Sequence, residues 1–232
     1  MEEIRDEGII LSQRAFGENE QIVKFFTFNS GLLSCFVRAR QLKSNSMSLS
    51  CLELILRPSR GQLYKIREAH CLDYALDLRK SLKKIQFAGK MARAIGFSQA
   101  ESKAAPKVYL SFKSYLSFLA KTEFEDAVLT SFYCKVLRHE GLLFQTLVCS
   151  ECSKKLDGLY LLEGQSFCEE HKPQRRAQEF YFFSKKEREE VEILTFSKKK
   201  QEIERSISES LAKKIEQIFY EVYEVEDRTK MD

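Results

Sequence analysis

The stretch EQIVKFFTFNSGLLSCFVRAR, residues 20–40, decides the fold class of this chain. Two runs rich in β-branched and aromatic residues flank Asn29-Ser30-Gly31, a short turn whose glycine supplies a permissive backbone. Upstream, Ile9 and Leu11 alternate with Ile10 and Ser12. Downstream, CLELILR (51–57) and QLYKIREAHCL (62–72) read as further strands. We therefore expect about five strands over residues 8–76, joined by tight turns.

Five such strands suit a small barrel of the OB type, and an SH3-like barrel is the nearest alternative. From Leu78 the apolar spacing becomes helical, and it predicts a first helix to about Phe97, a second from Pro106, a third that stops at Gly141, and a final amphipathic helix over 207–225. Ser184 and Glu187 fit a capping box. The predicted class is α+β and multidomain: an OB-fold barrel over residues 1–77, then an all-α domain over residues 78–232 that carries a zinc-binding insertion at 149–171.

Composition points to a globular chain with reduced thiols. Its 232 residues include seven cysteines, an odd number, and no apolar run approaches the ~20 residues that span a bilayer. The acidic start has no signal-peptide pattern. We expect a soluble cytoplasmic protein with no membrane partner, and we expect its four dispersed cysteines to be core residues: Cys35, Cys51, Cys71 and Cys134.

The remaining three cysteines belong to a metal-type cluster. Cys149 and Cys152 are spaced C-x₂-C, and after fifteen residues Cys168 and His171 form a second pair. Two pairs at this separation are typical of a tetrahedral zinc site. Glu169 or Glu170 in place of His171 stays an alternative for the fourth ligand. Four protein ligands leave no open position for water, so we predict one structural zinc.

Catalytic motifs are missing from the sequence. The zinc-deaminase pattern H-x-E with P-C-x-x-C fails, and there is no H-E-x-x-H and no phosphate-binding P-loop. His139 is expected in the last turn of a helix, where a cation suits the helix dipole. We therefore expect no catalytic residues and no enzyme.

The barrel segment is the basic part of the chain. Residues 8–67 hold three acidic residues, Glu18, Glu20 and Glu53, and nine basic ones. Phe16, Phe25, Phe26, Phe28, Phe36 and Tyr64 interleave with them, and cations beside aromatic faces are how sequence-tolerant single-strand binding works. Most of these aromatic residues are expected in the core. The candidate DNA contacts are Arg14, Lys24, Arg38, Arg40, Lys43, Arg57, Arg60, Lys65 and Arg67.

In this order the features resemble the RecO family of bacterial recombination mediators. The resemblance rests on Gly8-Ile9-Ile10-Leu11, Gly17-Glu18, Ile22-Val23, Thr27 to Gly31, Ala39-Arg40 with Lys43-Ser44, and LRHEGLLFQTLVCSEC before the second cysteine pair. It covers roughly residues 8–172. Many members end the metal site with a fourth cysteine where this chain has His171, and Gln41 and Leu42 replace further basic or proline residues. After Pro173 little resemblance is left.

The resemblance implies a protein that binds single- and double-stranded DNA, anneals complementary strands, and acts with RecR to load RecA onto strands coated by single-strand-binding protein. It also implies capture of the C-terminal tail of single-strand-binding protein, for which Lys83, Lys84, Lys90 and Arg93 are candidates. We expect such a protein to be cytoplasmic and nucleoid-associated. A zinc-ribbon RNA-binding or transcription accessory protein with an OB-type barrel is the alternative, and a zinc hydrolase or deaminase is disfavoured by the closed ligand set.

Overall fold

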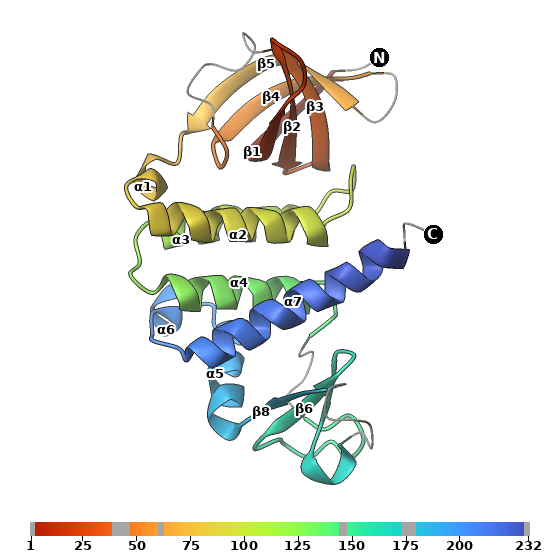
Figure 1. Ribbon diagram of the computed structural model, residues 1–232, viewed down its shortest axis with the longest axis vertical. Helices are drawn as coiled ribbons and strands as arrows, with labels where there is room; N and C mark the ends of the chain where they lie inside the picture. The colour runs from red at the N-terminus through yellow and green to blue at the C-terminus, as the bar shows by residue number, and fades with distance from the viewer. Residues whose placement is uncertain (1–2, 39–46, 60–62, 144–147, 173–179, 230–232) are drawn as a thin grey trace. The chain divides into compact units, whose positions relative to one another are not determined.

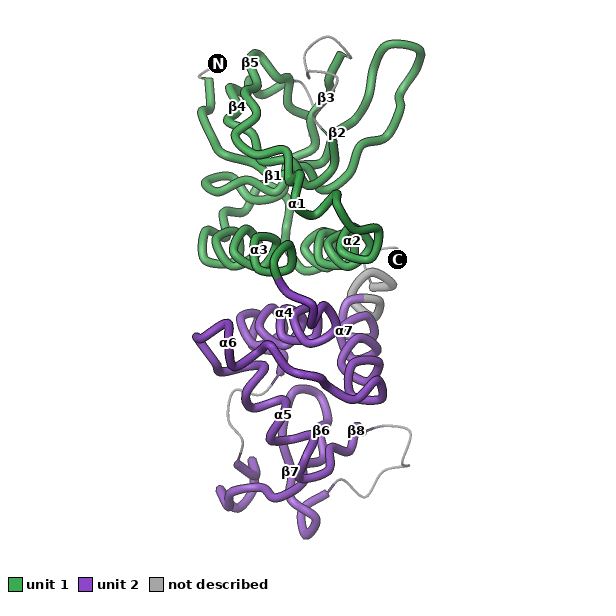
Figure 2. The backbone as a smooth tube through the Cα atoms, turned by 90° about the vertical axis from the view of Figure 1, so that its left-hand side faces the viewer, with its two compact units in different colours: residues 1–121 green, residues 122–232 purple. Residues whose placement is uncertain are grey.

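The computed structural model describes residues 3–38, 47–59, 63–143, 148–172 and 180–229. The chain forms two compact units, residues 1–121 and 122–232 (Figures 1 and 2). The first unit joins the strands and the first helices, and the second holds the remaining helices and a small sheet. The division between an OB domain and a helical domain at 77/78 stays a prediction.

The first unit opens with a closed barrel (Figure 1) of β1 (Ile4–Ala15), β2 (Glu20–Thr27), β3 (Gly31–Arg38), β4 (Cys51–Pro58) and β5 (Leu63–Asp73). The strand order is β1-β2-β3-β5-β4, and β4 pairs with β1 to close it. All neighbours are antiparallel except β3 and β5, which are parallel. This crossed order is that of a Greek-key OB barrel, which confirms the expected fold class over the SH3-like alternative.

The barrel core follows from the alternation of its strands. Successive side chains point to opposite faces, so every second residue of each strand enters the interior. Val23, Phe25, Leu33 and Cys35 are there, together with Ile10, Val37, Leu52, Leu54, Leu56 and Ile66. Three of the four dispersed cysteines, Cys35, Cys51 and Cys134, are buried, as expected, while Cys71 is half-buried.

The predicted turn between β2 and β3 is held by a buried carboxylate. Asp6 accepts hydrogen bonds from the backbone N–H groups of Glu7 and Asn29 and from the Ser30 hydroxyl, at 2.8–3.0 Å. Gly31 has a φ of +74°, and a Cβ there would lie 2.0 Å from the Lys103 carbonyl oxygen. The turn therefore requires glycine both for its backbone angle and for this close approach.

The described residues of the first unit also form the helices α1 (Leu76–Arg79), α2 (Leu82–Ser98) and α3 (Pro106–Leu119). The single helix expected from Leu78 is wrong at its start, because Ser81 interrupts it and caps α2 by accepting from the Lys84 N–H. Leu82, four residues after Leu78 and therefore on the same face of a continuous helix, is instead exposed. Pro106 begins α3, as predicted.

A polar network joins β1 to α3 within this unit. The Tyr109 hydroxyl donates to Glu7 at 2.7 Å, and the Lys113 ammonium donates to the same oxygen at 2.6 Å. Burial alone would raise the pKa of Glu7, but these hydrogen bonds outweigh it and lower that pKa below its ordinary value of 4.5. The ionised carboxylate therefore stabilises this contact.

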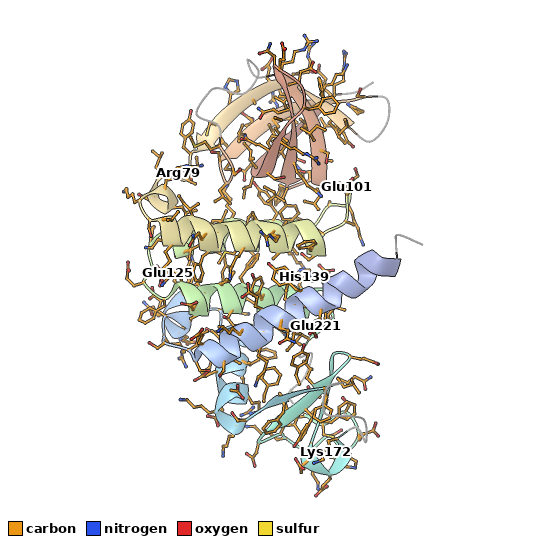
Figure 3. All side chains as sticks on the ribbon, in the orientation of Figure 1. Arg79, Glu101, Glu125, His139, Lys172 and Glu221 are labelled. Atoms are coloured by element: carbon orange, nitrogen blue, oxygen red, sulfur yellow. The ribbon has the colours of Figure 1, made fainter. Side chains whose placement is uncertain are left out.

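The second unit packs α4 (Glu125–His139), α5 (Lys185–Phe196), α6 (Lys200–Ile203) and α7 (Glu209–Thr229). His139 is the last residue of α4, as predicted (Figure 3). Gly141 follows with a φ of +80°, which suits the predicted helix end. The capping box of Ser184 and Glu187 at the start of α5 is confirmed.

A small sheet accompanies these helices. The strands β6 (Leu159–Leu162) and β7 (Gln165–Phe167) form the hairpin expected inside the cysteine cluster, and Glu163-Gly164 make its left-handed turn. A third strand, β8 (Tyr181–Phe183), pairs with β6 and was not predicted, because three residues are too short for a periodic signal. No helix within the described residues is long and apolar enough to cross a bilayer.

Candidate nucleic-acid interface and metal centre

A row of directly opposed residues crosses all five strands of the barrel. Arg14 opposes Ile22, Ile22 opposes Phe36, Phe36 opposes Lys65, and Lys65 opposes Arg57. Opposed residues in a sheet share one face. Arg14, Arg57 and Lys65 are exposed, so the face of this outer row is the outside of the barrel.

An exposed aromatic residue lies beside the outer row. Phe16 follows β1, and its N–H donates to the Glu20 carbonyl at 2.8 Å to close the β1–β2 loop. Its ring meets the Phe36 ring edge to face, with centroids 6.1 Å apart. Of the other aromatic residues of the barrel segment, Phe25 and Phe26 are fully buried, as expected, and Tyr64 packs against the core. Phe28 and Phe36 are only half-buried, so fewer of these rings lie in the core than predicted.

The nine predicted DNA-contacting cations divide into three groups. Three lie outside the described residues: Arg40, Lys43 and Arg60. Three form ion pairs, Lys24 with Glu101 at 3.5 Å, Arg38 with Glu20 at 4.0 Å, and Arg67 with Glu3 at 3.3 Å. The last three, Arg14, Arg57 and Lys65, form no ion pair with a described residue, and all three belong to the outer row.

This grouping was not visible in the sequence. Alternation along a strand tells which residues share a face, but it does not tell which residue of a distant strand lies opposite. The parallel pairing of β3 with β5 brings Phe36 beside Lys65, and the antiparallel pairing of β5 with β4 adds Arg57. The outer row therefore combines basic side chains with an aromatic one on the outside of the barrel.

The four cations predicted to bind a partner lie on α2. The ammonium groups of Lys83 and Lys90 lie 5.7 Å and 5.9 Å from the centre of the Phe87 ring, close enough for cation–π attraction. Arg93 is exposed. Lys84 differs, because its ammonium donates to the Ala120 carbonyl at 3.1 Å and so caps the end of α3.

The second unit brings the three clustered cysteines and His171 together. Their ligand atoms all lie within 4.8 Å of one another. The Cys152 and Cys168 sulfurs are 3.9 Å apart, and His171 Nδ1 lies 3.2 Å from the Cys168 sulfur and 3.8 Å from that of Cys149. Zinc bonds of about 2.0–2.3 Å at tetrahedral angles place ligand atoms roughly 3.3–3.8 Å apart. The four groups can therefore hold one metal ion.

Local backbone geometry builds this cluster. The Ser153 N–H donates to the Cys149 carbonyl at 2.9 Å with Ser153 at a φ of +58°, which turns the first cysteine pair back on itself. Cys168 precedes a short helical turn, η1 (Glu169–His171), and His171 ends it, with the His171 N–H donating to the Cys168 carbonyl. The fixed backbone thus presents both pairs to one point.

The chemistry of the donors also suits a metal. Burial would raise the pKa of the Cys149 thiol, but backbone N–H groups of Cys152, Cys168 and Glu151 outweigh it and lower that pKa to about 6. The two glutamates considered as alternative ligands are engaged elsewhere. Glu169 accepts from Tyr160 and Lys172, and Glu170 accepts from Lys154.

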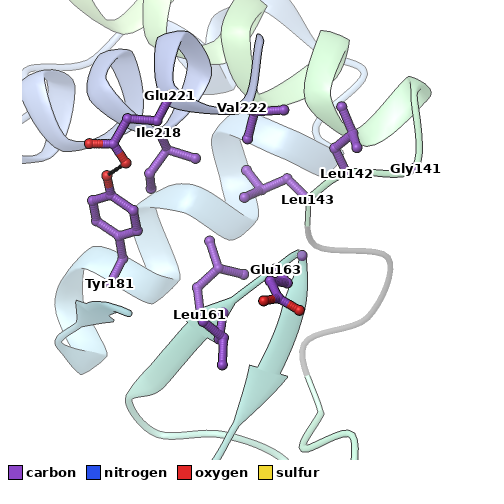
Figure 4. A pocket seen from close by; sticks show the side chains of 11 residues that line it. Gly141, Leu142, Leu143, Leu161, Glu163, Tyr181, Ile218, Glu221 and Val222 are labelled. Carbon is purple, nitrogen blue, oxygen red and sulfur yellow. Dashed lines mark hydrogen bonds between the residues drawn. The ribbon is translucent and has the colours of Figure 1, made fainter. Parts of the chain in front are cut away.

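A separate pocket lies between the β6–β7 hairpin and α7, within the second unit (Figure 4). Its volume is about 560 Å³. Leucine, isoleucine and valine side chains form most of its wall, and Tyr181 donates a hydrogen bond to Glu221 at its side. None of the four metal-type residues and none of the outer-row cations lines it, so the pocket belongs to neither site.

Known proteins resemble this chain in both its parts. The family model described as "Recombination protein O N terminal" matches residues 1–75. The DNA repair protein RecO of Chlamydia trachomatis serovar L2 is 28% identical over 177 residues, 71% of this chain and 70% of the relative. That of Chlamydia muridarum is 28% identical over 209 residues, 84% of this chain and 85% of the relative. That of Alkaliphilus metalliredigens is 22% identical over 157 residues. With the OB-type barrel and the motifs of its first strands, these matches confirm the resemblance of this chain to the RecO family of DNA repair proteins.

Proposed function

We propose that this protein is a DNA repair and recombination mediator that binds single- and double-stranded DNA and anneals complementary strands. The relatives are named DNA repair proteins. The observation that carries the proposal is the outer row, in which Arg14, Lys65 and Arg57 lie on one face of an OB-type barrel without an acidic partner among the described residues. Such a surface attracts phosphates.

Annealing on this surface requires no bond chemistry. Two polyanionic strands repel each other, and a basic surface that binds both releases counterions and lowers that repulsion. We therefore propose a protein without enzymatic activity, working in the bacterial cytoplasm on nucleoid DNA. Arg14, Arg57 and Lys65 would contact the sugar-phosphate backbone. Lys24, Arg38 and Arg67 would contribute once DNA competes with their exposed ion pairs, which are weak in water.

In the same proposal the protein acts with RecR to help load RecA onto DNA coated by single-strand-binding protein. The acidic tail of the latter would bind α2, where Lys83 and Lys90 flank Phe87 and Arg93 is exposed. Two large apolar side chains, Leu82 and Phe97, are exposed on the same helix. Cations next to apolar side chains fit a tail that carries both acidic and apolar residues.

The metal in this proposal is one zinc ion with a structural role. Cys149, Cys152, Cys168 and His171 would hold it, and when bound it would cross-link the two pairs without exposing a coordination position for water. The cysteine cluster would stabilise its module and take no part in a chemical step.

The test is annealing of complementary strands that are coated with single-strand-binding protein, with and without RecR. We expect the protein to anneal coated strands, RecR to modulate the reaction, and the variant Arg14→Ala/Arg57→Ala/Lys65→Ala to lose it. A protein that binds RNA strongly but cannot anneal coated DNA would instead be the RNA-binding or transcription accessory protein of the alternative hypothesis.

A further inference from the structure

Phe16, the exposed aromatic residue beside the outer row, has no role in the function proposed above. Phe16 is 55% exposed, although burying an aromatic ring is favourable and Phe25 and Phe26 of the same barrel are fully buried. It does not lie in a loose segment. The Phe16 N–H bonds the Glu20 carbonyl, the neighbouring Gly17 takes a φ of +84°, and the Phe16 ring packs edge to face on Phe36. The loop therefore presents the ring at a defined place.

The surroundings of the two rings carry positive charge. Phe36 lies between Ile22 and Lys65 in the outer row, and Arg14 and Arg57 extend the row on either side. Of the two acidic residues that follow Phe16, Glu20 at the start of β2 pairs with Arg38, while Glu18 is exposed in the loop. An anion with a flat apolar part would satisfy the cations and the rings together.

A single nucleic-acid strand has this chemistry, because its phosphates can reach the cations while an unpaired base stacks on a ring. A duplex presents the same phosphates, but its bases are stacked and paired inside the helix. We infer that Phe16 and Phe36 form a base-stacking site that makes the barrel prefer single-stranded over double-stranded DNA. This inference rests on the proposed DNA binding and adds to it a non-ionic source of strand preference.

The inference predicts that removing the Phe16 ring lowers the affinity for single-stranded DNA more than the affinity for double-stranded DNA. We expect Phe16→Ala to weaken binding of a single-stranded oligonucleotide at least about fivefold, the lower end for the loss of one base–aromatic stack, and to change binding of the duplex of the same sequence less than about twofold. The dependence of binding on salt should stay as in wild type, because no cation is removed. Fluorescence anisotropy over a salt series measures the affinity for single-stranded DNA, the affinity for the duplex, and the salt dependence of binding.

Phe182→Ala is the matched control. Phe182 is 47% exposed on β8 of the second unit and is not in the outer row, so its loss should leave both affinities unchanged. An equal loss on both DNA forms, or no loss on either, would overturn the stacking site while the proposed function stands. Failure of the wild-type protein to bind DNA would overturn the proposed function itself.

A second variant keeps the test independent of folding defects. The chain has no tryptophan, so Phe16→Trp introduces one fluorescent reporter at the site. Saturating single-stranded DNA should quench its emission by stacking, and duplex at the same saturation should quench it much less. Equal quenching by both forms would contradict the inference.

Discussion

Phe36 on β3 and Lys65 on β5 lie directly opposite each other across the barrel's parallel strand pair. The pairing places an aromatic residue and a lysine side by side on the outside of an OB-type barrel, next to Arg57 and in line with Arg14. The three predicted DNA-contacting cations that form no ion pair with a described residue thus lie in one row with Phe36, and the exposed Phe16 lies beside it.

Removing Arg57 and Lys65 from the outer row should weaken DNA binding, because two phosphate contacts are lost. For Arg57→Ala/Lys65→Ala we expect the slope of log affinity against log salt for single-stranded DNA to fall by about 1.4, which is ~0.7 for each lost phosphate contact. Titrations at several salt concentrations measure this slope. Arg67→Ala is the control from the same strand, because Arg67 is already paired with Glu3, and its effect should be smaller. Equal effects of the two variants would contradict the assignment.

The cysteine cluster should bind one zinc ion per chain, as measured by elemental analysis of the purified protein. Cys168→Ser should lose the metal and lower the melting temperature, because the binding free energy of a structural zinc is folding free energy. Cys71→Ser, on β5 and outside the cluster, should keep the metal. Retention of stoichiometric zinc in Cys168→Ser would show that this sulfur is not a ligand.

Acid should weaken the contact between β1 and α3. Hydrogen bonds lower the pKa of Glu7 in the folded protein below 4.5, so its ionised form adds stability above about pH 4.5, and that stability is lost as the pH falls through the folded pKa. The difference in unfolding free energy between wild type and Glu7→Gln should therefore be largest above about pH 5 and shrink in more acidic solution. Denaturant titrations from pH 3.5 to 7 test this, and a difference that grows toward acid pH would refute it.

Replacing a glycine by alanine should destabilise the protein at Gly31 and stabilise it at Gly89. Gly31→Ala puts a Cβ 2.0 Å from the Lys103 carbonyl oxygen at a left-handed φ, and we expect a loss of stability of at least about 1–2 kcal/mol. Gly89→Ala, inside α2 with nothing within 4 Å of the new Cβ, should instead gain roughly 0.5–1 kcal/mol from the better helix propensity of alanine. Chemical denaturation of both variants gives the comparison.

Much of the fold could be predicted from short-range patterns. The strands, the turn at Asn29-Ser30-Gly31, the start of α3 at Pro106 and the capping box at Ser184 all depend on residues that are neighbours in sequence. The break at Ser81 was missed because a serine within an apolar helical period is as compatible with a continuous helix as with a cap. The strand β8 was missed because it gains its partner only by pairing with β6.

The sequence by itself determined the barrel's strands and the four metal-type residues, since both depend on spacings of a few residues within continuous segments. Only the tertiary structure decided which cations act together. Strand register between distant segments follows from closing the barrel around one core, and that closure places Phe36, Lys65 and Arg57 in one row while Lys24, Arg38 and Arg67 meet acidic partners. The pairing of β1, β2 and β3 likewise brings Phe16 onto Phe36, so the fold gathers part of a basic composition into the row that we propose contacts DNA.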